Sequence, residues 1–203
     1  MDPKSIASIL RTEIEGRVLP PGTVLKQEDL AARFGVSRQP VRQALDWLQV
    51  EGLLVRRSDR SLAVHELSER DQRELVELRC LLECEALRLS LPGLDASALR
   101  RAGRLAADLE DEVDPAVLEE LDVAFHSALY AGCGNERLLR LIDSLRRQGR
   151  RAYAVQPPGS DYRALMAAQH QTILEACRAG DAAAAAAALA AHLRFQIPST
   201  SNP

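Results

Sequence analysis

Histidine is scarce in this sequence, and three of the four histidines fall on apolar helical faces of the C-terminal half. Asp122 and His126 are one helical turn apart in LDVAFHSAL, within or beside an apolar stripe. His170 and His192 follow the apolar spacing of two later segments. Each histidine alone is more often a core residue with a hydrogen-bond partner. Together, three neutral imidazoles and one carboxylate suit a borderline transition ion, so they predict a metal site.

Arg79 adds a charge to this part of the chain. It lies on the stripe formed by Leu75, Leu78, Leu82 and Ala86. A permanent charge is costly there unless it is paired. Two explanations stay open: an ion pair with Glu83 four residues later, or a ligand carboxylate held bidentately by the guanidinium.

A second set of candidate residues lies in GVSRQPVRQALDWL, residues 35–48. Ser37 is a preferred N-cap, so a helix begins at Arg38 and Pro40 falls in its first turn, where a missing amide costs little. The buried stripe consists of Val41, Ala44, Leu45 and Leu48, and the exposed side carries Arg38, Gln39, Arg42 and Gln43. Cationic side chains at the positive end of a helix dipole suit a polyanion.

Composition bounds the class of protein. The 203 residues are 46% hydrophobic and 27% charged, which is typical of a soluble globular chain with one or two domains. Aromatic residues are only 3%, which favours an aliphatic core of packed helices. No apolar run approaches the roughly 20 residues of a membrane span. With no signal-like N-terminus, we expect a cytoplasmic protein with four reduced cysteines.

The N-terminal elements follow one another in a recognisable order. We expect helices over residues 6–18, 27–34 and 38–51, with LPPGTVL as a tight connection and Gly35 as a left-handed C-cap. Two short β-prone runs follow, residues 53–56 and 62–64, around a basic tip. This order is typical of a winged helix-turn-helix.

The C-terminal half is predicted to be entirely helical. Breaks at LPGLD, DEVDP, AGCGN, QPPGSD and RAGD divide residues 68–194 into six helices with short connections, which favours an all-α antiparallel bundle. The expected fold is therefore mainly α. Its expected domains are a DNA-binding domain at residues 1–66, a helical domain at 67–196 and a tail at 197–203.

These motifs carry a family resemblance. The stretch LPPGTVLKQEDLAARFGVSRQPVRQALDWLQVEGLL resembles the GntR family of bacterial transcription regulators. The later stretches ELRCLLECEA, LDVAFH, GCGNERL, QHQTILEA and GDAAAAAAALAAHL are similar to the FCD ligand-binding domain of its FadR-like subfamily. The resemblance runs from about Ile6 to Leu193, with both signatures in the family's order.

The resemblance implies residue roles. The metal ligands would be Asp122, His126, His170 and His192, and Arg79 would face the effector. The DNA contacts would be Arg33, Ser37, Arg38, Gln39 and Arg42, with Arg60 at the wing tip. Two features depart from the family. The usual Asn-Arg-Gly-like wing turn is Asp59-Arg60-Ser61 here, so the wing's minor-groove geometry is not carried over. The last helix also exposes alanines where relatives carry charges, which indicates either a packing surface or a composition bias.

We therefore expect a homodimeric DNA-binding regulator that is not an enzyme, with repression as the usual behaviour of the family. It would bind a short inverted repeat in an operator and respond to a small carboxylate metabolite through a divalent metal, zinc or else nickel or manganese. In one alternative, the metal itself is the signal. In another, the chain is a metallohydrolase whose ion activates water, and turnover of a substrate would favour it.

Overall fold

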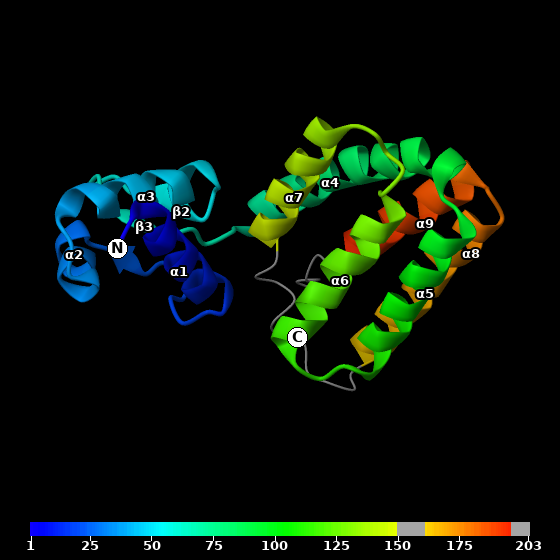
Figure 1. Ribbon diagram of the computed structural model, residues 1–203, viewed down its shortest axis with the longest axis horizontal. Helices are drawn as coiled ribbons and strands as arrows, with labels where there is room; N and C mark the ends of the chain where they lie inside the picture. Colours follow the sequence, from blue (N-terminus) through cyan, green and yellow to red (C-terminus); the bar gives the residue numbers. More distant parts are fainter. Residues whose placement is uncertain (150–160, 196–203) are drawn as a thin grey trace. The chain divides into compact units, whose positions relative to one another are not determined.

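The computed structural model describes residues 1–149 and 161–195, and its contacts divide the chain into two compact units, Met1–Ser68 and Glu69–Pro203 (Figure 1). The sequence placed this division between residues 66 and 67. The expected tail at residues 197–203, and most of the QPPGSD break, lie outside the described residues. Each unit has its own hydrophobic core.

The first unit contains three helices and a small sheet. Its elements are α1 (Pro3–Glu15), β1 (Val24–Leu25), α2 (Gln27–Phe34), α3 (Arg38–Val50), β2 (Leu54–Arg56) and β3 (Leu62–Val64). The strands are antiparallel in the order β1-β3-β2. The predicted bounds of α2 are confirmed, and Gly35 ends that helix with a left-handed φ of 64°. The winged helix-turn-helix prediction is confirmed.

Two predictions for the start of the chain were wrong. The first helix begins at Pro3 rather than residue 6, because the Asp2 carboxylate accepts hydrogen bonds from the Lys4 and Ser5 amides. It ends at Glu15 rather than residue 18. The segment LPPGTVL is more than a tight connection, because its Val24 and Leu25 form β1 against β3.

Helix α3 packs its predicted apolar stripe into the core of this unit, where it meets α1. Ser37 takes the N-cap position in an extended conformation, but its side chain makes no capping hydrogen bond. Pro40 lies in the first turn, as predicted. The stripe is buried, so the opposite side of α3, with Arg38, Gln39 and Arg42, is exposed.

The wing tip closes without the glycine that the family pattern contains. Arg60 takes a left-handed φ of 68°, a conformation that costs a non-glycine residue about 1–2 kcal/mol. Asp59 supports the turn, because its carboxylate accepts hydrogen bonds from the amide and the hydroxyl of Ser61. The hairpin thus keeps a tight turn by straining an arginine.

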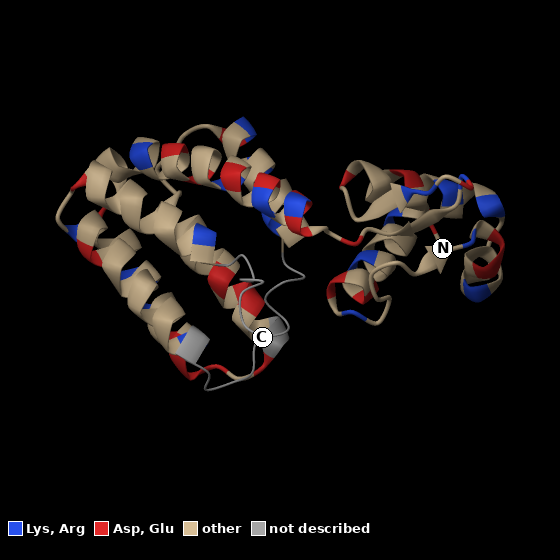
Figure 2. Cartoon of the chain, turned by 180° about the vertical axis from the view of Figure 1, so that it is seen from behind, with Lys and Arg blue, Asp and Glu red and all other residues tan. Residues whose placement is uncertain are grey.

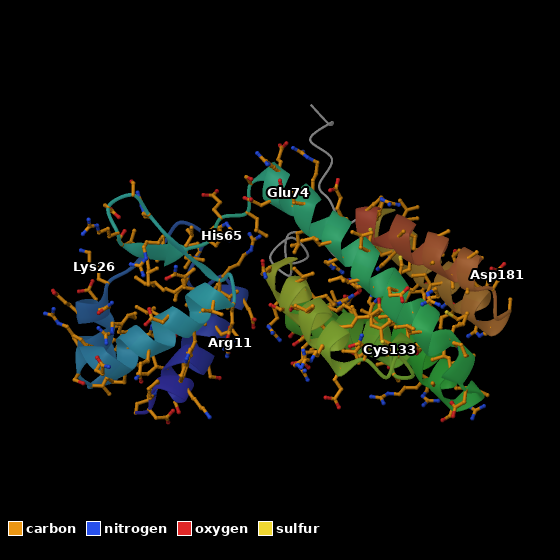
Figure 3. All side chains as sticks on the ribbon, turned by 90° about the horizontal axis from the view of Figure 1, so that it is seen from above. Arg11, Lys26, His65, Glu74, Cys133 and Asp181 are labelled. Carbon is orange, nitrogen blue, oxygen red and sulfur yellow. The ribbon has the colours of Figure 1, made fainter. Side chains whose placement is uncertain are left out.

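The second unit is helical throughout its described residues. Its elements are α4 (Glu69–Ser90), a 3-10 turn η1 (Leu91–Gly93), α5 (Ala96–Asp111), α6 (Pro115–Leu129), α7 (Glu136–Gly149), α8 (Asp161–Arg178) and α9 (Ala182–Phe195). Helix α4 packs against α7 and α9, while α5 packs against α6 and α8. Side chains fill the space between the helices, and Cys133 is one of them (Figure 3). The predicted six-helix bundle is confirmed.

Helix α9 approaches α4 closely because its side chains are small. The Cys80 and Cys84 thiols of α4 contact the backbone carbonyls of Ala190 and Ala186, at 3.8 and 3.3 Å. All four cysteines are free, as expected for reduced thiols. Part of the alanine-rich segment is therefore a packing surface within the bundle.

Candidate metal centre and DNA-binding surface

The four predicted metal ligands converge inside the second unit. Helix α6 supplies Asp122 and His126, α8 supplies His170, and α9 supplies His192. All four side chains are buried, and one ligand atom from each lies within 4.8 Å of every other. The apolar helical faces identified in the sequence therefore meet at one point.

The hydrogen-bond partners of two imidazoles fix which nitrogen faces the cluster. Tyr130 donates its hydroxyl hydrogen to Glu83 at 2.8 Å, so its oxygen accepts from His126 Nδ1 at 3.2 Å. His192 Nδ1 likewise lies 3.2 Å from the Gln169 side-chain oxygen, which can only accept. The Nε2 atom of each of these two imidazoles is therefore unprotonated and carries a free lone pair. The two Nε2 atoms face each other at 3.3 Å, and such a pair repels unless a cation lies between.

Other polar atoms of the cluster lack partners among the described residues. Asp122 Oδ1 and both ring nitrogens of His170 are buried without a hydrogen bond. Asp122 Oδ1 lies 3.6 Å from His126 Nε2 and 3.8 Å from His170 Nε2. Two ligands of a tetrahedral zinc ion, each at its usual bond length, are about 3.4 Å apart. The donor set therefore fits a transition metal in both chemistry and spacing.

Protonation states also favour metal binding. Burial lowers the pKa of His126, His170 and His192, in the case of His170 to about 4. Burial alone would raise the pKa of Asp122, but His126 and the Arg146 guanidinium hold it well below its ordinary value. At neutral pH the cluster consists of neutral imidazoles and an ionised carboxylate, which are the forms that ligate a metal.

A buried ion network that the sequence did not predict holds the cluster in place. Arg146 of α7 donates to Glu83 Oε2 at 2.5 Å and to Asp122 Oδ2 at 2.6 Å. Burial opposes ionisation of Glu83, but Arg146 and Arg79 lower its pKa to about 2. Arg146 was detectable in principle, because it continues the buried stripe of Leu138 and Ile142 on α7.

Arg79 has the intramolecular partner that the sequence offered as one explanation. Its Nε donates to Glu83 Oε1 at 2.7 Å, and the pair is buried. Arg79 is absent from the lining of the cavity beside the cluster, whereas Arg146 is part of that lining. The effector role implied for Arg79 stays a prediction.

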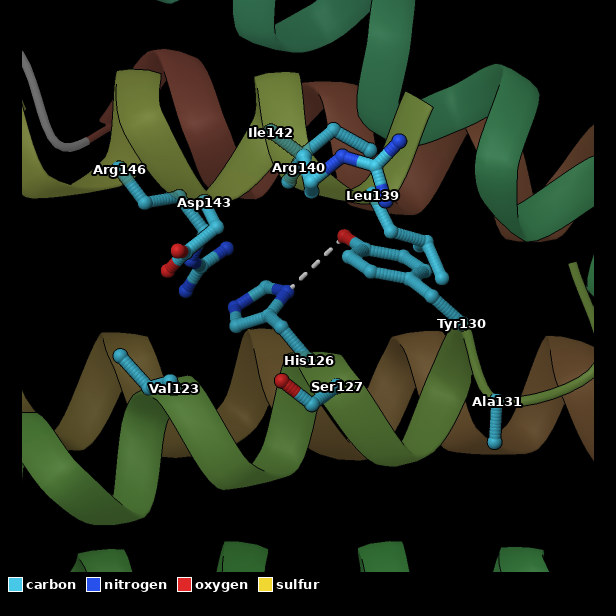
Figure 4. Close-up of a pocket in the computed structure, with 10 residues that line it drawn as sticks. All are labelled: Val123, His126, Ser127, Tyr130, Ala131, Leu139, Arg140, Ile142, Asp143 and Arg146. Carbon is cyan, nitrogen blue, oxygen red and sulfur yellow. Dashed lines mark hydrogen bonds between the residues drawn. The ribbon is translucent and has the colours of Figure 1, made fainter. Parts of the chain in front are cut away.

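The cavity lies between α6 and α7 and has a volume of about 310 Å³. Its lining residues are Val123, His126, Ser127, Tyr130, Ala131, Leu139, Arg140, Ile142, Asp143 and Arg146 (Figure 4). His126 and Arg146 thus connect the cavity to the four predicted metal ligands. This volume is at the lower end of small-molecule pockets.

The predicted DNA contacts lie on the first unit, where basic and acidic residues are interspersed (Figure 2). Arg38, Gln39 and Arg42 are exposed at the start of α3. Arg38 pairs with Glu28 at 2.9 Å. Arg33 makes a two-pronged pair with Glu13 of α1, so both its terminal nitrogens are engaged within the unit. The Arg60 side chain belongs to the strained wing tip.

Comparison with known proteins identifies both units. Residues 3–64 match the model of bacterial regulatory proteins of the gntR family, and residues 74–195 match the FCD domain. The chain is 31% identical over 191 residues to a probable D-xylose utilization operon transcriptional repressor of Paenarthrobacter nicotinovorans, covering 93% of this chain and 83% of that protein.

Solved structures agree. A GntR-family transcriptional regulator from Pseudomonas syringae pv. tomato is 34% identical, with a TM-score of 0.56 over 96% of this chain and 82% of that one. A putative GntR regulator from Rhodococcus is 26% identical, with a TM-score of 0.77 over 95% and 93%. No helix in the described part of the chain is long and apolar enough to span a bilayer. The chain belongs to the GntR family of bacterial transcription regulators and carries an FCD domain as its second unit.

Proposed function

We propose that this regulator is a homodimeric, cytoplasmic repressor whose FCD domain binds a divalent transition metal and a small carboxylate effector. Asp122, His126, His170 and His192 would hold the metal, with zinc as the expected ion and nickel or manganese as alternatives. The two His Nε2 lone pairs that face each other, beside an unbonded Asp122 oxygen, carry this proposal. A bound metal would supply a cationic centre that attracts the effector carboxylate.

The effector would enter the cavity between α6 and α7. Arg146 lines this cavity and bonds Asp122, so an anion there would lie close to both a guanidinium and the metal ligands. We therefore expect the carboxylate to lie nearer to Arg146 than to Arg79, because Arg146 lines this cavity and Arg79 does not. Effector binding would then alter contacts of α6 and α7 and change operator affinity.

Elemental analysis tests whether the chain binds a metal ion. Protein resupplied in turn with zinc, nickel and manganese should retain one ion per chain, and chelation should lower the melting temperature. Free metal at a hundred times its Kd contributes about 2.7 kcal/mol to folding.

The His126→Ala and His170→Ala variants should lose the metal and the effector response, yet keep DNA affinity. Tight metal retention by both variants would contradict the proposal. Metal-loaded protein that releases DNA only after a carboxylate is added would exclude the metal as the sole signal.

The DNA-binding part of the proposal rests on the first unit. Ser37, Arg38, Gln39 and Arg42 would contact the major groove from the start of α3, and Arg60 would contact DNA from the wing. Because one such module reads only a few base pairs, two copies related by a two-fold axis would read an inverted repeat. Arg33 would contribute mainly by fixing α2 against α1 through Glu13.

Exposed leucines on the second unit support the homodimer. Leu78 and Leu81 of α4 are 49% and 70% exposed, and Leu141 of the adjacent α7 is 56% exposed. A second copy would cover them. Light scattering should give the mass of a dimer at micromolar concentration, and Leu81→Glu should shift it towards the monomer. If light scattering gave the mass of a monomer for the wild-type protein, both with and without DNA, that result would contradict the proposed homodimer.

A further inference from the structure

Arg38 is held by a carboxylate from the neighbouring helix. Its Nη2 lies 2.9 Å from Oε1 of Glu28, and both side chains are 67% exposed. Glu28 is in the first turn of α2, and Arg38 is the first residue of α3. The ion pair therefore joins the N-terminal turns of the two helices that form the helix-turn-helix.

Stability does not account for this pair. Exposed ion pairs contribute about 0–1 kcal/mol. The helix dipole favours Glu28 at the start of α2 but disfavours a cation such as Arg38 at the start of α3. On the side of α3 that faces DNA in the proposed function, a carboxylate also repels the phosphate backbone. The position of Glu28 thus weakens general DNA attraction, which calls for a functional reason.

The geometry of the Arg38 guanidinium suggests a functional reason for the position of Glu28. Arginine carries five N–H donors, and the ion pair brings the Glu28 carboxylate to Nη2 of Arg38. Donors remain for the O6 and N7 acceptors of a guanine, which arginine contacts as a fork. Arg33 differs, because both of its terminal nitrogens are bonded to Glu13. Holding Arg38 in one orientation before binding reduces the entropy lost on contact with a base.

We propose that Glu28 is a positioning residue for base recognition: it orients Arg38 towards a guanine edge and disfavours contact of Arg38 with phosphate. This inference rests on the proposed role of Arg38 in DNA binding and adds a residue that determines specificity. Glu28 lowers affinity for DNA in general and sharpens the preference for one base pair.

The binding of DNA duplexes by the whole 203-residue chain tests the positioning role of Glu28. The probes are a 30-bp duplex selected by wild type from a randomised library, its single base-pair variants, and a scrambled duplex. Arg38→Ala should lose the preference at one base pair by about tenfold or more. Glu28→Gln should weaken the same preference and bind the scrambled duplex about threefold to tenfold more tightly at low salt.

Two controls separate orientation from charge. Asp29→Asn removes the same charge from the next exposed position of α2 and should leave the base preference unchanged. Glu28→Asp keeps the charge but shortens its reach, so it should weaken the preference while scrambled-duplex affinity stays near wild type.

Two results would contradict the inference while the proposed function stands: an intact base preference in Glu28→Gln when Arg38→Ala loses it, or an equal effect of Asp29→Asn. If Arg38→Ala keeps every preference, the DNA role of Arg38 fails as well.

Discussion

In the first unit, the charged side chains proposed to contact DNA are exposed, and those with ion-pair partners use a single carboxylate each. In the second unit, the charged side chains at the candidate metal site are buried, and the single carboxylate of Glu83 bonds Arg79, Arg146 and Tyr130. An exposed residue can be changed without disturbing its neighbours, whereas a buried network responds as a whole. The fold should therefore tolerate substitution on the proposed DNA-contacting surface, but not at the proposed metal site.

The largest expected effect is a loss of folding stability on substitution of Arg146. Arg146→Met leaves Asp122 and part of Glu83 as uncompensated buried charges, which should cost about 3–5 kcal/mol of unfolding free energy. A calorimetric or circular-dichroism melt should show a drop of about 10 °C. The control Arg147→Met, one residue further along α7, breaks only its partly exposed pair with Asp143 and should cost less than about 1 kcal/mol. Equal losses in both variants would contradict a cooperative buried network.

Substitution of the exposed Arg42 should lower DNA affinity but not stability. Arg42→Ala should weaken operator binding by about 1–3 kcal/mol if the side chain reads a guanine. Because Arg42 is exposed, the melting temperature should stay within about 1 °C of wild type. Fluorescence anisotropy over a range of salt concentrations measures the affinity. A folded Arg38→Ala, Arg42→Ala double variant that binds operator like wild type would show that α3 does not read DNA.

Tyr130 tests whether the buried network supports the proposed metal site. Tyr130→Phe removes the acceptor of His126 Nδ1, so the imidazole loses its fixed orientation. Metal affinity should fall about tenfold, as it does when a group supporting a ligand is lost. Competition with a fluorescent chelator measures the change. Ser127→Ala, next to His126 and also at the cavity, serves as the control and should keep wild-type metal affinity.

The smallest effect is expected at the wing. Arg60→Gly relieves the left-handed strain, so the unit should gain up to about 1 kcal/mol of stability. DNA affinity should fall at the same time, with a salt slope that is smaller by about 1. Arg57→Gly has no such strain to relieve and should destabilise the hairpin. If both variants respond alike, the strain at Arg60 has no energetic consequence.

The sequence predicted the four proposed ligands because each of them interrupts an apolar helical stripe, a signal contained in a single helix. It did not predict Arg146, Glu83 and Tyr130 as one network, because their contacts join residues 47 and 63 positions apart. Strand β1 was missed for a related reason. Two residues after a Pro-Pro-Gly turn have no periodicity of their own, and their extended conformation depends on pairing with β3. Local patterns predicted the elements and the meeting of the four proposed ligands, but not the ion network or the strand pairing between elements.

The burial of the four proposed metal ligands determines how slowly a bound ion would exchange. These ligands come from three helices and are buried, so release of an ion bound by all four would require these helices to separate locally. Such openings are rare compared with the diffusion of a metabolite into a cavity that is already formed. We therefore expect the ion to be acquired once, near the time of folding, and to remain for much of the protein's lifetime. On the proposed function, the metal would then reflect the conditions at the time of synthesis, while the effector would follow the conditions of the moment.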